Sequence, residues 1–172
     1  IRNSSDQLNF ILLDEFLKKN IFEIEKKIEN FLNNIFLILD YQIFFPVKIS
    51  IKKNFGGKSI TTENLNYLLN DTKKDCYKTF LEKKIIHIIL DRYLVDEKSF
   101  SNLPSDVTCN FLSLDISFFC LSNKEIKNFE EILKKYQIII TKILSADYVR
   151  SLFNQNNHDL ILMANLVKDG YN

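Results

Sequence analysis

Glycine and proline are scarce in this chain of 172 residues, which contains three Gly and two Pro. Because these residues mark most turns and flexible linkers, the sequence offers few places for a tether between domains. A hydrophobic content of 46% is typical of a globular core and argues against disorder. We expect one compact body, in which any domain boundary lies within packed structure.

Cysteine is also scarce. Cys76, Cys109 and Cys120 are odd in number and form no Cys-x-x-Cys pair. The pattern therefore indicates neither a disulfide framework nor a zinc site. We expect three reduced thiols, as is usual in the cytosol.

Charge of one sign and long apolar runs are lacking as well. The net charge is +1, from 23 basic and 22 acidic side chains, so no strong field attracts nucleic acid or an anionic membrane. The longest apolar runs, such as 35–39 and 85–90, are far shorter than the roughly 18 residues of a membrane span. No signal sequence is visible at the amino end. Because the chain opens on Ile1 rather than Met, we expect an excerpt of a longer protein.

The amino-terminal part contains a pattern typical of a helix. Asn20 and Glu23 have the spacing of a capping box, and apolar residues recur at intervals of three and four from Ile21 to Leu39. This pattern predicts a helix of about five turns. The preceding residues, 8–19, fit the end of a strand or a helix equally well.

A strand and a second helix are predicted next. Val47, Ile49 and Ile51 alternate with polar residues, which is typical of a half-buried strand. Gly56-Gly57 then predicts a turn. Thr61 or Thr62 can cap the following helix, whose apolar face includes Leu65, Leu68 and Leu69.

The most informative stretch is 84–122. Two β-rich segments, 84–96 and 111–122, flank a polar loop with Asn102 and Pro104. Ser122 and Glu125 then form a capping-box pattern before an amphipathic helix that ends near Tyr136. The order of this unit is strand, strand, helix.

The carboxyl-terminal part predicts one strand over 138–144 and a closing helix over 159–169, with Gly170 at its carboxyl-terminal cap. The coarse order is therefore α, β, α, β, β, α, β, α. It predicts an α/β or α+β fold, with a small sheet of mixed strands and helices packed on it.

Candidate phosphate and metal sites are weak. Gly57-Lys58-Ser59 matches the end of a phosphate-binding loop, but Lys52 stands where that motif needs its first Gly, so a turn is favoured. His87 lies in an apolar strand, which favours a structural role. His158 has only Asp159 beside it, and a metal site needs more ligands.

Three carboxylates, Asp91, Asp96 and Asp115, are the remaining acid–base candidates. Asp91 and Asp96 are an odd number of positions apart in one strand, so strict alternation places them on opposite faces. We expect solvated side chains on the sheet or its turns. No nucleophile, base and orienting group can be brought together, so no catalytic residue is assigned.

Against this background, the segment His87-Ile-Ile-Leu-Asp-Arg-Tyr93-Leu-Val-Asp96 resembles one found in the bacterial cell-division protein family FtsA. The family has His, two apolar residues, Pro, two polar residues, Tyr, two apolar residues and Asp; Leu90 replaces the proline. Asn102 and Pro104 lie where the family has an Asn-Pro loop, although its glycine is absent. The following strand, 111–121, is also similar.

The resemblance extends over about 20–153. Similar features include the helix and strand at 22–39 and 47–51, Thr-Thr-Glu at 61–63, the helix and strand at 123–140, and Leu-Ser-Ala at 144–146. FtsA proteins are actin-like and carry a small strand-helix-strand-strand (SHS2-like) insert. The resemblance implies a partial actin-like lobe at 1–55, the insert at 56–136, and a return to the lobe with the closing helix at 137–172.

The resemblance also implies a function. FtsA proteins bind ATP between two lobes, polymerise, tether FtsZ filaments to the membrane and recruit later division proteins. Both Asp-x-Gly phosphate loops of the family are missing here, so we expect no cofactor in this chain and no enzyme activity. The expected location is the cytoplasmic face of the cell membrane, with attachment through a segment that this sequence lacks.

The candidate interaction surface comprises Asp91, Arg92, Tyr93 and Asp96. We expect it to lie along an exposed sheet edge, whose unpaired backbone groups can bind a neighbour. Two alternatives stay open. One is a pilus-assembly component of the PilM type, which has a related insert. The other is a small nucleic-acid-binding α/β module, which the balanced charge and the missing ribonucleoprotein motif argue against.

Overall fold

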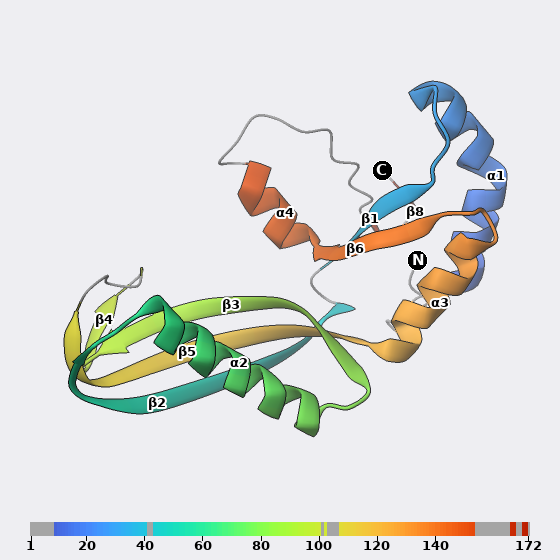
Figure 1. Cartoon of the computed structure of the whole chain (residues 1–172). Helices are drawn as coiled ribbons and strands as arrows, with labels where there is room; N and C mark the ends of the chain where they lie inside the picture. The colour runs from blue at the N-terminus through green and yellow to red at the C-terminus, as the bar shows by residue number, and fades with distance from the viewer. Residues whose placement is uncertain are drawn as a thin grey trace. The chain divides into compact units, whose positions relative to one another are not determined.

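The computed structural model describes residues 9–40, 43–100, 102, 107–153, 166–167 and 170–171 (Figure 1). The fold is α+β, as the sequence predicts. Parallel and antiparallel strands lie in separate sheets rather than in one mixed sheet.

The chain forms two compact units instead of the single body expected. One unit comprises Ile1–Phe44 and Asn123–Asn172, and the other comprises Phe45–Ser122. The second unit is therefore inserted into the first along the sequence. Its limits differ from the insert expected at 56–136. The unit includes the whole strand Phe45–Ser59, which contains the glycines, and it excludes the helix that starts at Asn123.

The inserted unit is an antiparallel sheet with one helix on it, in the strand order β2-β5-β3-β4 (Figure 1). The longest strands of the sheet are β2 and β5, and β5 lies in the centre between β2 and β3. Its elements are β2 (Phe45–Ser59), α2 (Thr62–Thr79), β3 (Lys83–Val95), β4 (Lys98–Phe100) and β5 (Thr108–Ser122).

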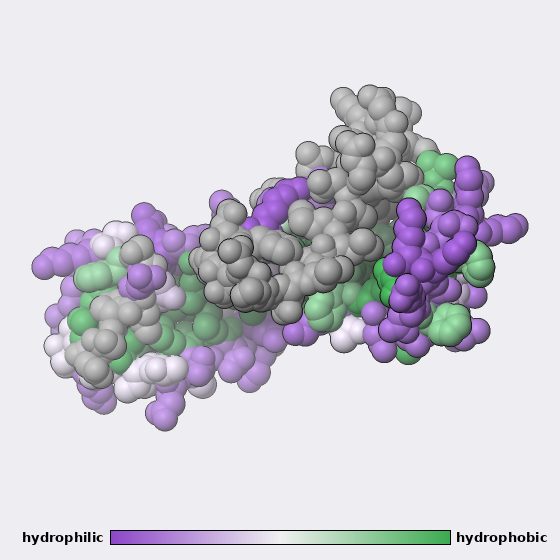
Figure 2. Space-filling model, turned by 90° about the horizontal axis from the view of Figure 1, so that it is seen from above, coloured by the Kyte–Doolittle hydropathy of each residue, from purple (hydrophilic) through white to green (hydrophobic). Residues whose placement is uncertain are grey.

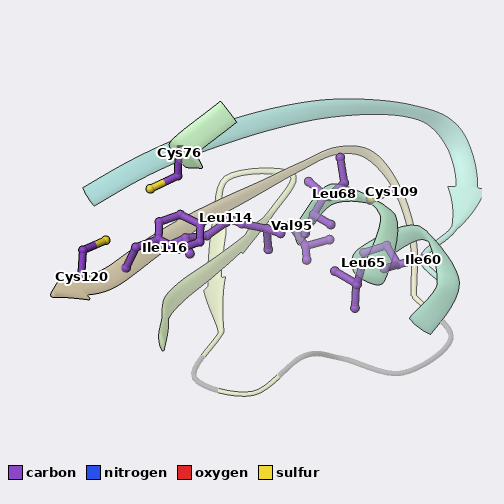
Figure 3. Packing of buried hydrophobic residues seen from close by; sticks show 11 residues of the cluster. Ile60, Leu65, Leu68, Cys76, Val95, Cys109, Leu114, Ile116 and Cys120 are labelled. Atoms are coloured by element: carbon purple, nitrogen blue, oxygen red, sulfur yellow. The ribbon is translucent and has the colours of Figure 1, made fainter. Parts of the chain in front are cut away.

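Helix α2 begins at a capping box, and its N-cap is Thr61, one of the two threonines that the sequence offers. The Thr61 hydroxyl accepts a hydrogen bond from the Asn64 backbone N–H at 3.2 Å, and the Asn64 side chain accepts one from the Thr61 N–H. These two bonds satisfy backbone donors that the helix itself leaves unpaired. Leu65 and Leu68 then face the sheet, as Figure 3 shows.

The core of this unit comes mainly from alternate residues of β5. Leu112, Leu114, Ile116 and Phe118 are at most 1% exposed. Period-two alternation aims all four side chains at the face that α2 covers. This strand is central because its alternate positions are the most consistently apolar in the unit.

The glycine pair in β2 makes a bulge and not the expected turn. Gly56 and Gly57 have φ values of 59° and 78°, and the pairing with β5 shifts register between Asn54 and Lys58. Beyond the bulge the strand continues, with Lys58 opposite Cys109. Glycine adopts positive φ without steric cost, so it bends the strand without ending it.

The other unit combines helices with a parallel strand pair, β1 and β6. Helix α1 starts after Asn9, whose side chain accepts the N–H groups of Ile11 and Leu12, and it ends before Glu29 at φ 53°. The elements of this unit are α1 (Phe10–Ile28), β1 (Asn34–Leu39), α3 (Asn123–Lys134), β6 (Ile139–Ser145) and α4 (Ala146–Phe153).

The helix predicted over 20–39 is wrong at both ends. Helix α1 already begins at Phe10, so Asn20 lies inside it, where its side chain donates to the Phe16 carbonyl instead of capping a helix start, and Asn34–Leu39 forms β1. A continuous apolar run is also typical of a parallel strand, and spacing alone does not distinguish the two. The predicted strand at 138–144 and the helix after Ser122 are confirmed as β6 and α3. Helix α4 was not predicted.

Helix α1 contacts α3 and the residues that directly follow α3. Phe10 and Phe129 meet edge to face with ring centroids 4.9 Å apart, and the Tyr136 hydroxyl donates to the Asp14 carboxylate at 3.0 Å. The molecular surface in Figure 2 exposes both hydrophilic and hydrophobic residues. In the unit with the parallel strand pair, the exposed hydrophobic residues include Phe22 and Phe31, at 71% and 75% exposure.

The closing helix predicted over 159–169 is contradicted where the structure describes it. Leu166–Val167 (β7) pairs with Gly170–Tyr171 (β8) as two antiparallel strands. The rest of that range, and His158, lie outside the described residues.

Candidate interaction surface

Two bulges in β3 decide where its polar side chains lie. The register against β5 shifts between Ile85 and His87, and again between Leu90 and Arg92. Asp91 is the extra residue of the second bulge, which breaks the strict alternation used to separate it from Asp96. Asp91 and Asp96 therefore line depressions on the same face of the sheet, the face opposite α2.

Arg92 and Asp115 form an ion pair across β3 and β5. Arg92 Nη2 lies 2.6 Å from Asp115 Oδ2, and Arg92 Nε donates to the same oxygen at 2.8 Å. Ser50 on β2 donates to Asp115 Oδ1 at 2.7 Å. These contacts, the Ser50 hydrogen bond first, hold the pKa of Asp115 below its usual value.

Asp91 is fixed by a separate contact, because its carboxylate accepts a hydrogen bond from the Ser117 hydroxyl on β5. Ser117 is only 2% exposed, so its hydroxyl needs a partner inside the protein. Asp91 and Arg92 are thus both tied to β5. Ser50, Arg92 and Asp115 are joined across three strands, and we call these three residues the sheet-face network; the Asp91–Ser117 pair lies on the same face.

Asp96 has a structural role at the turn between β3 and β4. Its backbone has φ 44°, and its carboxylate accepts the N–H groups of Asn110 and Phe111 at 3.0 and 2.8 Å. Asp96 also donates its own N–H to the Phe111 carbonyl at 3.0 Å. The carboxylate therefore holds the turn against the start of β5.

Tyr93 does not lie with the other three predicted residues. It is half-buried, pairs with Leu114 in the register, and packs against the core under α2. Burial raises the pKa of its hydroxyl. Of the four residues, the structure brings Asp91 and Arg92 together, places Asp96 at the adjoining turn, and directs Tyr93 to the helix side.

Two shallow depressions mark this face. The first is lined by Lys48, Ile49, Ser50, Asp91, Arg92, Asp115 and Ile116. The second is lined by Lys52, Leu94, Asp96, Glu97, Asn110, Phe111 and Ser113, and Lys52 Nζ lies 4.7 Å from the Phe111 ring centroid.

Sequence reasoning missed Ser50, Lys48, Lys52 and Ser117. Their signal was the polar half of each alternating strand, at positions 48, 50 and 52 of β2 and 113, 115 and 117 of β5. Only the strand order reveals that the two sets are neighbours.

The remaining candidates show no reactive chemistry. Cys76, Cys109 and Cys120 are free and buried. Figure 3 shows Cys76 on α2 close to Cys120 on β5, and burial is the main cause that raises the pKa of Cys120 to about 11. A thiol that stays protonated is a poor nucleophile. Burial lowers the pKa of His87. The segment Gly57-Lys58-Ser59 lies inside β2, whereas a phosphate-binding loop would open a helix.

No cluster of His, Cys, Asp and Glu suited to a metal ion occurs among the described residues. The helices in the described part of the chain are too short or too polar to cross a bilayer. A comparison with known proteins found no matching family model and no similar curated protein.

Proposed function

We propose that this chain is part of an FtsA-like cell-division scaffold that works by protein association. The observation that carries the proposal is the chain order: a unit of strand, helix and two long strands, with the three-residue β4 between the two, is inserted at Phe45–Ser122 between β1 and β6, which pair in parallel. An insert of this order within an actin-like lobe is what the resemblance to FtsA implies. The similarity of the His87–Asp96 segment supports the same family.

The sheet-face network gives the proposal a contact surface. Its charged groups lie on the face opposite α2, and Arg92 is 53% exposed although it is paired. Exposed, ordered charges favour specific and reversible protein contacts more than they favour tight binding. The network offers positioned donors and acceptors to a neighbouring subunit.

Self-association is the direct test. Sedimentation velocity of the 172-residue chain over a concentration series should show reversible oligomers, and Arg92→Ala should shift the distribution towards monomer. Tyr67→Ala is the matched control, since Tyr67 is 65% exposed on α2, away from the network. Tyr93→Ala is unsuitable because Tyr93 packs against the core.

A chain that stays monomeric and does not co-sediment with FtsZ filaments contradicts the proposal. The PilM-like alternative predicts another result, namely binding of an inner-membrane partner's tail peptide without filament formation. Retention on immobilised RNA that falls with added salt would instead favour the nucleic-acid module.

A further inference from the structure

The free edge of β2 is the feature that the proposed function leaves unused. In the order β2-β5-β3-β4, β2 is at the end, and β5 is the only described strand that pairs with it. Half of the backbone N–H and C=O groups of an edge strand point away from its sheet. From Val47 to Lys53 each residue has a partner on β5, so this stretch is regular.

The charges along this edge have one sign. Strand β2 has lysines at positions 48, 52, 53 and 58 and no acidic residue, and all four lysines are exposed. Within the described part of the chain, none of them forms an ion pair. Lys48 and Lys52 lie on the face opposite α2, with Ser50 between them.

The opposite face of the same edge is apolar. Val47, Ile49 and Ile51 are half-buried and pack against the core under α2. An added strand places alternate side chains beside each of these two rows. The edge therefore fits a strand that alternates acidic residues beside the lysines with apolar residues beside Val47, Ile49 and Ile51.

A second copy of this chain fits poorly. Antiparallel pairing of two β2 edges about Ser50 would put Lys48 of each copy opposite Lys52 of the other, and like charges in that position destabilise a strand pair. The edge of β3 also starts with lysines, Lys83 and Lys84. The one acidic residue of β3 is Asp91, and its carboxylate already accepts a hydrogen bond from Ser117, so β3 of another copy does not supply the two acidic residues.

We propose that the Val47–Lys53 edge of β2 binds an acidic, extended segment of another protein as an added strand. Backbone hydrogen bonds would give the affinity, and the lysines would select the partner by charge. This inference concerns a different partner from the self-association proposed above, so either can fail alone.

The test uses the full chain and a labelled heptapeptide, acetyl-Val-Glu-Val-Thr-Val-Glu-Val-amide. We expect saturable binding by fluorescence anisotropy, with amide NMR shifts centred on Val47–Lys53. Replacing both peptide Glu residues by Lys, or methylating the backbone nitrogens on one edge, should abolish binding. Lys48→Glu with Lys52→Glu should weaken it about tenfold, because two attractive cross-strand pairs become repulsive.

Lys74→Glu with Lys127→Glu is the matched control, since it makes the same charge change at exposed sites on α2 and α3 and should leave binding unchanged. Edge lysines also protect sheets from aggregation. If no peptide binds and the Lys48→Glu, Lys52→Glu variant self-associates, protection is their only role and the proposal is overturned. Equal binding of oligo-dT would overturn it too, because the edge would then recognise any polyanion.

Discussion

Asp91 and Arg92 show how much a single extra residue changes a strand. They are neighbours in sequence, yet Asp91 bonds to Ser117 while Arg92 pairs with Asp115 on the same face. The bulge makes this possible, since regular alternation would send one of them towards α2. Strands often carry such bulges next to functional sites.

The Asp115 carboxylate gives a residue-scale prediction. Because its folded pKa is depressed, Asp115 adds stability above its unfolded pKa, and this stability is lost as the pH falls through the folded pKa. Asp115→Asn should lower the free energy of unfolding by about 1 kcal/mol at neutral pH, a modest value because Arg92 is half exposed. Urea titrations should show the difference shrinking below about pH 4. A difference that does not change with pH would contradict the depressed pKa.

At the scale of the element, the glycine bulge explains how β2 reaches its full length. A tight turn at this point would end the strand before it pairs with Thr108 and Cys109. The bulge instead lets Lys58 and Ser59 join the sheet before the chain enters α2. Backbone conformation, more than side-chain packing, sets this path.

Gly57→Ala tests whether the backbone conformation at the bulge sets the path of β2. Nothing lies within 4 Å of an added Cβ, so only the positive φ of 78° opposes the substitution. The cost should be about 1–2 kcal/mol of unfolding free energy, measured by urea denaturation. Ser59→Ala, an exposed position of the same strand, should cost far less. Equal effects of the two substitutions would show that the left-handed conformation is not needed.

At the scale of the whole molecule, the inserted unit has the features of an independent folding unit. Its buried cluster is drawn from residues between Ile60 and Cys120, and Phe45 pairs with Cys120, so its two ends lie on neighbouring strands. A unit whose ends meet can be inserted into another fold with little disturbance.

A fragment of residues 45–122 should therefore fold alone. We expect cooperative thermal unfolding and dispersed amide NMR signals. Leu114→Asp, at a position with 0% exposure, should abolish both by burying an unpaired charge. An unfolded wild-type fragment would mean that the unit depends on the rest of the chain.

Local patterns in the sequence predict the α+β class, a start of α2 at Thr61 or Thr62, the start of α3 after Ser122, and strands β5 and β6. Capping residues and alternation act over a few positions, so these features are local. Prediction from the sequence fails where two local patterns coincide, as in the apolar run that contains β1.

The remaining features depend on how the strands pair in three dimensions. The order β2-β5-β3-β4 brings Ser50, Arg92 and Asp115 together, and the bulges in β2 and β3 set which residues share a face. Pairing between strands that are distant in sequence depends on how whole faces pack, and no local pattern encodes it. Asp91, Arg92, Tyr93 and Asp96 are candidates from the sequence, whereas the contacts of Asp91 with Ser117 and of Arg92 with Asp115 follow only from the pairing of β3 with β5.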